Sequence, residues 1–198
     1  MNLRSRSCNA QPRRPMSPRA DAVRNRTKIL DAAREQITLH GPDAGMDEIA
    51  AAAGVAVGTL YRHFPNKTDL VSAVLTEHLD RVADDIEAAR ERTAGGAKAM
   101  DEILGLVERV LEASATDHAV KAAARLLGAY PTDELVEDRT GTALAELIQA
   151  AQADGELHDD VTVQDFYLLI NTAPTDQPPA VRSRWLTLVL PGLTTRGR

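Results

Sequence analysis

Residues 54–70, GVAVGTLYRHFPNKTDL, restrict the possible folds of this chain more than any other segment. A glycine and a short apolar stretch lead into a brief helical pattern, a Pro-Asn pair ends that pattern, and a new helix opens on a lysine. Another short helical pattern, at 47–53, ends at the glycine. Two short helices joined by a tight turn form a helix-turn-helix, so the segment predicts this motif.

The predicted second helix of the motif, residues 57–63, is expected to enter the major groove of DNA. At about 100° per residue, Leu60 and Phe64 point in the same direction, and we expect them to form the core side of this helix. Tyr61 lies at the edge of that side, where its ring can pack on the core while its hydroxyl reaches a phosphate. Glycine costs a helix about 1 kcal/mol relative to alanine, so Gly58 suggests close approach by a bulky partner. The face opposite the core presents Gly58, Thr59, Arg62 and His63.

Helical periodicity recurs along the rest of the chain, without the alternation typical of strands. We predict an all-α fold with helices at 21–40, 47–53, 57–63, 67–92, 100–111, 117–128, 132–153, 162–172 and 178–190. Residues 19–75 are expected to form a three-helix DNA-binding domain, which the long helix joins to a helical domain at 76–198. The segment 1–18 is rich in proline and arginine and is expected to be a disordered basic tail.

The composition, with 43% hydrophobic and 26% charged residues, is that of a soluble globular protein. The longest uncharged run, residues 49–61, is too short to cross a bilayer, so no membrane association is expected. The basic N-terminus precedes no apolar block and does not resemble a secretory signal. Cys8 is the only cysteine, which leaves no internal disulfide and no thiol cluster. We therefore expect a cytoplasmic protein.

Charge is distributed unevenly along the chain. The net charge is −6, but residues 1–75 carry +4 and residues 76–198 carry −10. A basic first third attracts phosphate, while an acidic body discourages indiscriminate binding. Taken alone, this distribution fits a solvated basic tail as well as it fits nucleic-acid binding.

The sequence does not favour an all-α enzyme, because it lacks the residue combinations that catalysis needs. It contains no Cys/His pair, no phosphate-binding loop and no paired carboxylates on one helical face. His40, His63 and His78 have no ligand spacing to one another, so we expect no metal site and no cofactor.

Residues 29–75 resemble the N-terminal domain of the TetR family of bacterial transcriptional regulators. The resemblance rests on ILDAA, DEIAAAAGV, GTLYRHF and NKTDL at their expected spacings. It implies phosphate contacts from Thr59, Tyr61 and His63, and positions near base edges for Val57, Gly58 and Arg62. It also implies that Lys67, in the first turn of the next helix, holds the DNA backbone.

Two positions depart from the family pattern. Ala56 and Gly45 stand where family members often have Ser or Thr, and a missing cap costs a helix about 0.5–2 kcal/mol. Asn66 and Asp69 are expected to be the N-cap and third position of the following helix, as in a capping box. Affinity for DNA is then expected to depend more on the basic tail and on Arg24, Arg26 and Lys28.

For residues 76–198 the resemblance implies dimerisation through the last two helices and a small-molecule pocket. Pro191 should end the final helix at about residue 190. The candidate dimer interface is Phe166, Tyr167, Ile170, Trp185, Leu188 and Val189, with intrachain core as the alternative. The candidate effector pocket is Met100, Leu104, Val107, His118, Leu127 and Tyr130, with close helix packing as the alternative.

These features predict a sequence-specific DNA-binding regulator of transcription. We expect a homodimeric repressor that binds a near-palindromic double-stranded operator and is released by a small, apolar effector. The alternative is a regulator of the same fold that has no small-molecule effector and is controlled by protein contacts or abundance.

Overall fold

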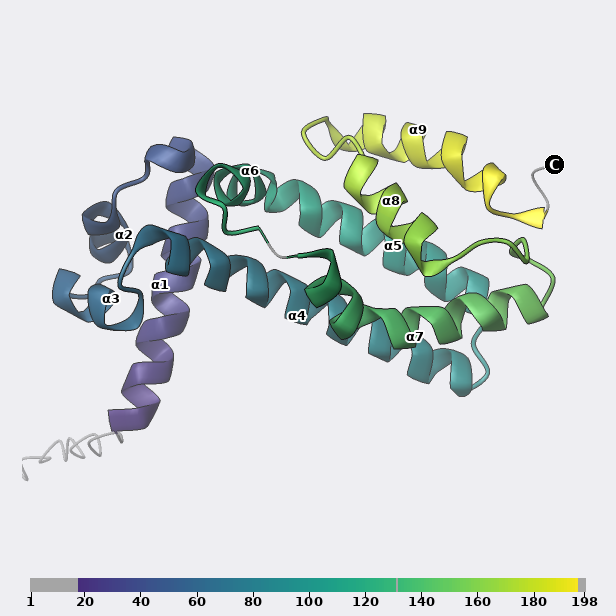
Figure 1. The fold of residues 1–198 in the computed structure, drawn as a ribbon, viewed down its shortest axis with the longest axis horizontal. Coiled ribbons are helices and arrows are strands. Elements are labelled where there is room, and N and C mark those ends of the chain that lie inside the picture. The colour runs from purple at the N-terminus through teal and green to yellow at the C-terminus, as the bar shows by residue number, and fades with distance from the viewer. Residues whose placement is uncertain (1–17, 131, 196–198) are drawn as a thin grey trace, which may run out of the picture.

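The computed structural model describes residues 18–130 and 132–195, and within these ranges every regular element is helical (Figure 1). The described residues form no strand pairing apart from one isolated bridge between Leu157 and Thr194. The predicted all-α fold is therefore confirmed. The predicted tail, including Cys8, lies outside the described residues except for Pro18. The elements are α1 (Pro18–His40), η1 (Gly41–Asp43), α2 (Met46–Ala52), α3 (Val57–His63), α4 (Lys67–Ala94), α5 (Ala99–Thr116), α6 (His118–Leu127), α7 (Asp133–Ala153), α8 (Val163–Thr172), α9 (Pro179–Val189) and η2 (Leu190–Gly192).

The first three α-helices and the start of α4 pack around one core. Its fully buried side chains include Leu30 and Ile37 of α1, Ile49 of α2, Leu60 of α3 and Leu70 of α4. These positions recur at helical spacing in the sequence, and burial of such apolar faces is the main source of stability for helices as short as α2 and α3.

α6 also packs against this N-terminal unit (Figure 1). Val120, Ala123 and Ala124 are fully buried in the same core as α1 and α4. The division expected between residues 75 and 76 is therefore bridged twice, covalently by α4 and through side-chain packing by α6.

A second core lies between the far half of α4 and the helices α5, α7, α8 and α9. Figure 1 shows α7 alongside the far half of α4, with α8 and α9 on the opposite side of α5 and α7 from α4. Buried side chains from each partner helix meet here, among them Ile86, Ile103, Leu147, Phe166 and Leu186.

Two local features determine how the recognition motif is placed. Gly54 has a φ of 64°, which glycine adopts without steric cost, and it turns the chain from α2 toward α3. At the start of α4, Asn66 Oδ1 accepts a hydrogen bond from the Asp69 N–H at 2.8 Å, and Asn66 Nδ2 donates to Asp69 Oδ2 at 2.9 Å. The predicted N-cap at Asn66 is therefore confirmed.

Some helix ends differ from the prediction. α1 begins at Pro18, because proline suits the first turn of a helix. α5 continues to Thr116, beyond the expected end at residue 111, through a segment of small and polar residues that carries little apolar signal. By contrast, α9 ends at Val189, next to the predicted end at about residue 190, and Pro191 lies in the following turn η2.

Candidate nucleic-acid interface and ligand cavity

The recognition helix α3 is held by its core face. Leu60 is fully buried and Phe64 is 4% exposed, so both predicted core positions are confirmed. Tyr61 is 44% exposed and Val57 is 41% exposed, although each is a large hydrophobic residue. The ring of His63 lies tilted beside Phe64, with 6.3 Å between ring centroids. α3 therefore presents an exposed face that carries the predicted DNA-contacting side chains.

On this exposed face, Arg62 folds back along its own helix. Its Nε donates to the Gly58 carbonyl at 3.0 Å, and its Nη2 donates to the Thr59 hydroxyl at 3.2 Å. A Cβ added to Gly58 would have no atom within 4 Å, so packing within the protein does not require glycine there. Close approach of an outside partner to Gly58 stays a prediction.

Lys67 has a structural role that the sequence did not reveal. Its ammonium donates hydrogen bonds to the carbonyls of Pro42 and Ala44, in the segment that leads into α2. Lys67 thereby ties the start of α4 to the start of the helix-turn-helix. An ammonium has three donors, so one N–H remains for the predicted contact with the DNA backbone.

The predicted basic residues of α1 lie on its N-terminal half and are exposed. Arg26 places its guanidinium 5.5 Å from the centroid of the Phe64 ring, which brings it next to α3. Arg24 pairs with Asp21 on the same helix. Lys28 is exposed one turn further along α1. Of these three side chains, the structure therefore places Arg26 against the recognition helix.

The two missing caps differ in their consequences. Gly45 has no side chain, but Glu48 compensates in part, since its Oε2 accepts the Gly45 N–H at 3.0 Å. Ala56 precedes α3 without any side-chain cap. α3 is therefore held by Leu60 and Phe64 rather than by its own N-terminus.

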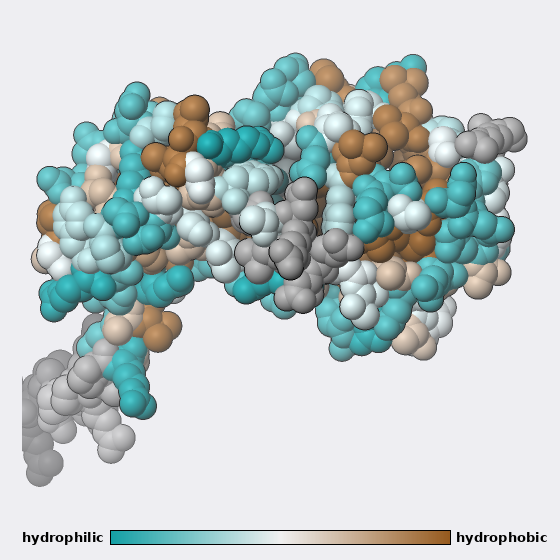
Figure 2. All heavy atoms as spheres, viewed as in Figure 1, coloured by the Kyte–Doolittle hydropathy of each residue, from teal (hydrophilic) through white to brown (hydrophobic). Residues whose placement is uncertain are grey.

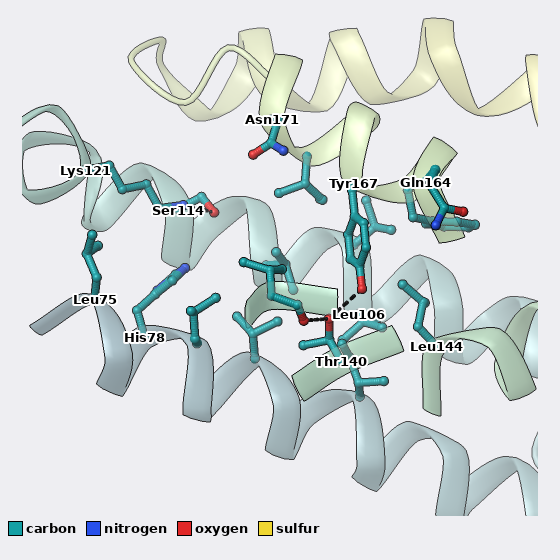
Figure 3. A pocket seen from close by; sticks show the side chains of 18 of the residues that line it. Leu75, His78, Leu106, Ser114, Lys121, Thr140, Leu144, Gln164, Tyr167 and Asn171 are labelled. Carbon is teal, nitrogen blue, oxygen red and sulfur yellow. Dashed lines mark hydrogen bonds between the residues drawn. The ribbon is translucent and has the colours of Figure 1, made fainter. Parts of the chain in front are cut away.

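A cavity of about 350 Å³ lies between α4, α5, α7 and α8 (Figure 3). Most of its wall is aliphatic, with Leu79, Val82 and Ile86 from α4 and Leu106 and Val110 from α5. At one side, the Tyr167 hydroxyl lies 2.8 Å from the Thr140 hydroxyl, which in turn donates to the Val136 carbonyl at 2.8 Å. The wall also includes His78, Ser114, Lys121 and Asn171.

The predicted pocket residues are only partly correct. Val107 and Tyr130 line the cavity, whereas Met100, Leu104, His118 and Leu127 do not. Met100 and Leu104 pack into the second core, and Leu127 packs against the N-terminal core. His118 is exposed, with its Nδ1 3.2 Å from the Thr175 hydroxyl.

The missed wall residues come chiefly from α4 and α8. Leu75, Leu79, Val82 and Ile86 recur every three or four residues, so they form one face of α4. That stripe was visible in the sequence as an apolar face, but the pattern does not say whether such a face meets a close-packed neighbour or a cavity.

Most of the candidate dimer residues lie within one chain, as in the alternative of an intrachain core. Phe166, Tyr167 and Ile170 line the cavity within one chain, because α8 turns this face toward α4 and α5. Trp185 and Val189 are half-buried against the second core. Only Leu188, at 63% exposed, faces outward.

Other outward-facing apolar residues take their place. Leu168 of α8 is 62% exposed, and Val181 of α9 is also exposed. Figure 2 shows hydrophobic residues gathered on the surface over α8 and α9. The candidate dimer surface is therefore the outer face of these two helices.

A buried acidic side chain, Asp117, connects the two units. Arg34 Nε of α1 donates to Asp117 Oδ1 at 2.9 Å, His78 Nδ1 of α4 lies 3.0 Å from Oδ2, and Arg81 Nη2 lies 3.4 Å from Oδ2. Burial by itself raises the pKa of Asp117, but the hydrogen bond from His78 and the charges of Arg34 and Arg81 outweigh it and hold the pKa below its usual range. His78 also lines the cavity, so the cavity wall and α1 share this network.

Across residues 18–130 and 132–195, no group of three His, Cys, Asp or Glu side chains is arranged to hold a metal ion. Over the same ranges, no helix is both long and apolar enough to cross a membrane.

Two short helices, α2 and α3, are joined by a tight turn at Gly54, and the second helix is exposed. They are attached to a larger bundle of helices. This combination is typical of a helix-turn-helix regulator of transcription. Residues 29–74 match the model for bacterial regulatory proteins of the tetR family. Residues 104–195 match the C-terminal domain of SbtR-like transcriptional regulators. The chain belongs to the TetR family of transcriptional regulators.

Individual relatives agree with this assignment. The chain is 31% identical over 146 residues to the transcriptional repressor KstR of Mycolicibacterium smegmatis, covering 71% of this chain and 70% of the relative. It is 46% identical over 57 residues to the uncharacterized regulator TtgW of Pseudomonas putida, but that match spans only 42% of the relative's length. These relatives are regulators of transcription, not enzymes.

Solved structures extend the likeness over the whole fold. A TetR regulator from Mycobacterium vanbaalenii is 30% identical with a TM-score of 0.67, and the match covers 90% of this chain and all of that one. A TetR regulator from Streptomyces coelicolor is 30% identical with a TM-score of 0.64, and the match covers 85% of this chain and 98% of that one.

Proposed function

We propose that this protein is a homodimeric repressor that binds a near-palindromic DNA operator through α3 and leaves it when a small, mainly apolar molecule occupies the cavity. The observation that carries the proposal is the course of α4. This helix begins at Lys67, tied to the helix-turn-helix, and further along it supplies Leu79, Val82 and Ile86 to the cavity wall. One rigid element therefore touches both sites. Bacterial DNA lies in the cytoplasm, where we expect the protein to act.

In this proposal the exposed face of α3 reads the operator. Thr59, Tyr61 and His63 contact phosphates, which fix the position of the helix. Val57, Gly58 and Arg62 lie near base edges, where sequence is read. The DNA backbone is further held by positive charges: Lys67, Arg24, Arg26 and Lys28.

Dimerisation is supported by the exposed apolar faces of α8 and α9. A two-fold interface must be self-complementary, and two antiparallel copies of this face would bury Leu168, Val181 and Leu188 against their counterparts. Two α3 helices related by such an axis would then meet successive major grooves, about 34–36 Å apart.

The cavity favours effector control over the alternative without an effector. A close-packed bundle would support regulation by protein contacts or abundance, whereas an apolar cavity of about 350 Å³ is within the range of ligand sites. The relative KstR is named as a repressor, which supports the sign of regulation proposed here.

Selection of bound duplexes from a randomised DNA pool tests the DNA-binding part of the proposal. The enriched sequences should contain an inverted repeat, and sedimentation at micromolar concentration should give a dimer. A monomer that binds isolated half-sites as tightly as the full repeat would contradict the proposed mode of binding.

A further inference from the structure

We propose that the effector carries an anionic head group, a carboxylate, which Lys121 binds while the hydrocarbon part fills the aliphatic length of the cavity. This inference rests on the proposed function, because it takes the cavity to be the effector site. It adds the chemical class of the ligand and the residue that selects it.

The polar end of the cavity is built by three helices (Figure 3). Lys121 comes from α6, Ser114 from α5 and His78 from α4, and all three line the cavity. The Lys121 ammonium donates to the Ser114 hydroxyl at 2.8 Å. His78 uses Nδ1 toward the Asp117 carboxylate, which can only accept, so its Nε2 is the ring atom left for other partners.

Lys121 is an unusual residue for this position. Within the part of the chain that the structure describes, its ammonium pairs with no carboxylate, and a hydroxyl does not neutralise a positive charge. Asp117 attracts it electrostatically but is already bonded to Arg34 and His78. Burial lowers the pKa of Lys121 to about 8; the charge of Asp117 only partly opposes this shift, and the charge of Arg125 adds to it. Lys121 is half-buried, and a charge that is partly removed from water without a charged partner is costly, whereas a ligand carboxylate would supply that partner.

Apart from Tyr130, Thr140, Gln164, Tyr167 and Asn171, the rest of the wall matches a hydrocarbon. Leu79, Val82, Ile86, Val107, Val110 and Leu144 offer no polar side-chain atoms. The hydroxyls of Tyr167 and Thr140 already bond to each other, so they do not require polar atoms from a ligand. With one cation at one end and an aliphatic length beyond it, the cavity fits an amphiphile with one negative charge.

Calorimetry on the full chain at pH 7 tests the head group, with decanoate and its uncharged counterpart decanamide as probes. We expect decanoate to bind about tenfold more tightly, since hydrogen bonds to charged groups are worth more than neutral ones. Lys121→Met should abolish this preference and leave decanamide within about twofold of its original affinity. Lys98→Met is the matched control, because Lys98 is exposed before α5 and should leave both probes unaffected.

Proton uptake gives a second readout that a structural role of Lys121 would not produce. At pH 9 the free ammonium has largely lost its proton, and a bound carboxylate should restore it. Titrations in two buffers of different ionisation enthalpy should therefore show uptake of a proton with decanoate, and none for Lys121→Met.

The outcomes separate this inference from the proposed function. The carboxylate assignment would be overturned if decanoate and decanamide bound with equal affinity, or if Lys121→Met weakened both probes equally. It would also be overturned if decanoate binding took up no proton, or if neither probe bound. The proposed function would still hold if a neutral apolar compound released the operator. Failure of the unliganded protein to bind any selected duplex would instead overturn the proposed function itself.

Discussion

At the scale of single residues, Lys67 combines a fold role with a proposed DNA role. Lys67→Ala should weaken binding about equally on all DNA sequences and lower the salt slope by about 1, as loss of one phosphate contact requires. The variant also loses two hydrogen bonds to the Pro42 and Ala44 carbonyls, so the free energy of unfolding should fall by about 1–3 kcal/mol. Salt titrations and denaturant melts measure the two effects separately. A stability loss without any change in salt slope would leave Lys67 only its structural role.

Arg62 is predicted to read a base. Arg62→Ala should relax the preference at one base pair by about 1–3 kcal/mol, provided that the guanidinium leaves Gly58 and Thr59 to bind guanine. The free energy of unfolding of this variant should hardly change, because the Arg62 side chain is exposed. Selection on a randomised operator is the measurement, and an unchanged sequence preference would assign Arg62 to phosphate.

Gly58 offers a substitution that separates stability from binding. Alanine has room at this position and favours helix, so Gly58→Ala should keep or raise the free energy of unfolding, by up to about 1 kcal/mol. Affinity for the operator should fall at the same time if DNA approaches this backbone closely. Thermal melts and operator-binding titrations on one preparation of the variant measure the two effects. An unaltered affinity for the operator would contradict close approach of DNA to Gly58.

The residue scale also shows where sequence-based prediction succeeds. Leu60 and Phe64 are buried as predicted, because a helical wheel determines which side chains share a face. The contacts of Lys67 with Pro42 and Ala44 were not predictable, since they join positions far apart in the chain. Periodicity identifies an apolar face but does not identify what that face meets.

At the scale of elements, the same limit explains the errors in the C-terminal part. The helices themselves were predicted nearly throughout, but α8 turns Phe166 and Tyr167 inward, to the cavity, and leaves Leu168 outside. α6 belongs to both parts, because Lys121 lines the cavity whereas Val120 and Ala123 lie in the N-terminal core. Such choices depend on how helices pack in three dimensions, which a single helical pattern does not contain.

The network at Asp117 is the element-scale feature with the clearest energetic signature. Asp117→Asn leaves Arg34, His78 and Arg81 without their shared carboxylate, and we expect a loss of about 3–5 kcal/mol at pH 7. The pKa of Asp117 is lower in the folded state than in the unfolded chain, so its contribution is fully present above about pH 4 and is lost as pH falls through the folded value. Denaturant melts from pH 7 downward should show wild type and variant converging in acid. A constant difference at all pH values would contradict this role.

At the scale of the whole molecule, three connections join the DNA-binding surface to the cavity. α4 runs from Lys67 to the cavity wall, and α6 carries Lys121 in that wall while packing against the N-terminal core. The Asp117 network adds a third link through Arg34 of α1. A ligand that changes the position of α4 or α6 would therefore change how the two α3 helices of a dimer fit successive grooves.

The most direct test of this account is the affinity of a cavity ligand measured with and without saturating operator. The ligand can be decanoate or any compound found by thermal-shift screening. Coupling between such sites typically amounts to about 1–3 kcal/mol, and by linkage the operator must weaken the ligand by the same factor by which the ligand weakens the operator. We predict a ligand dissociation constant about 5–150-fold higher in the presence of operator. An identical dissociation constant under the two conditions would contradict ligand-controlled release and favour a regulator that works without an effector.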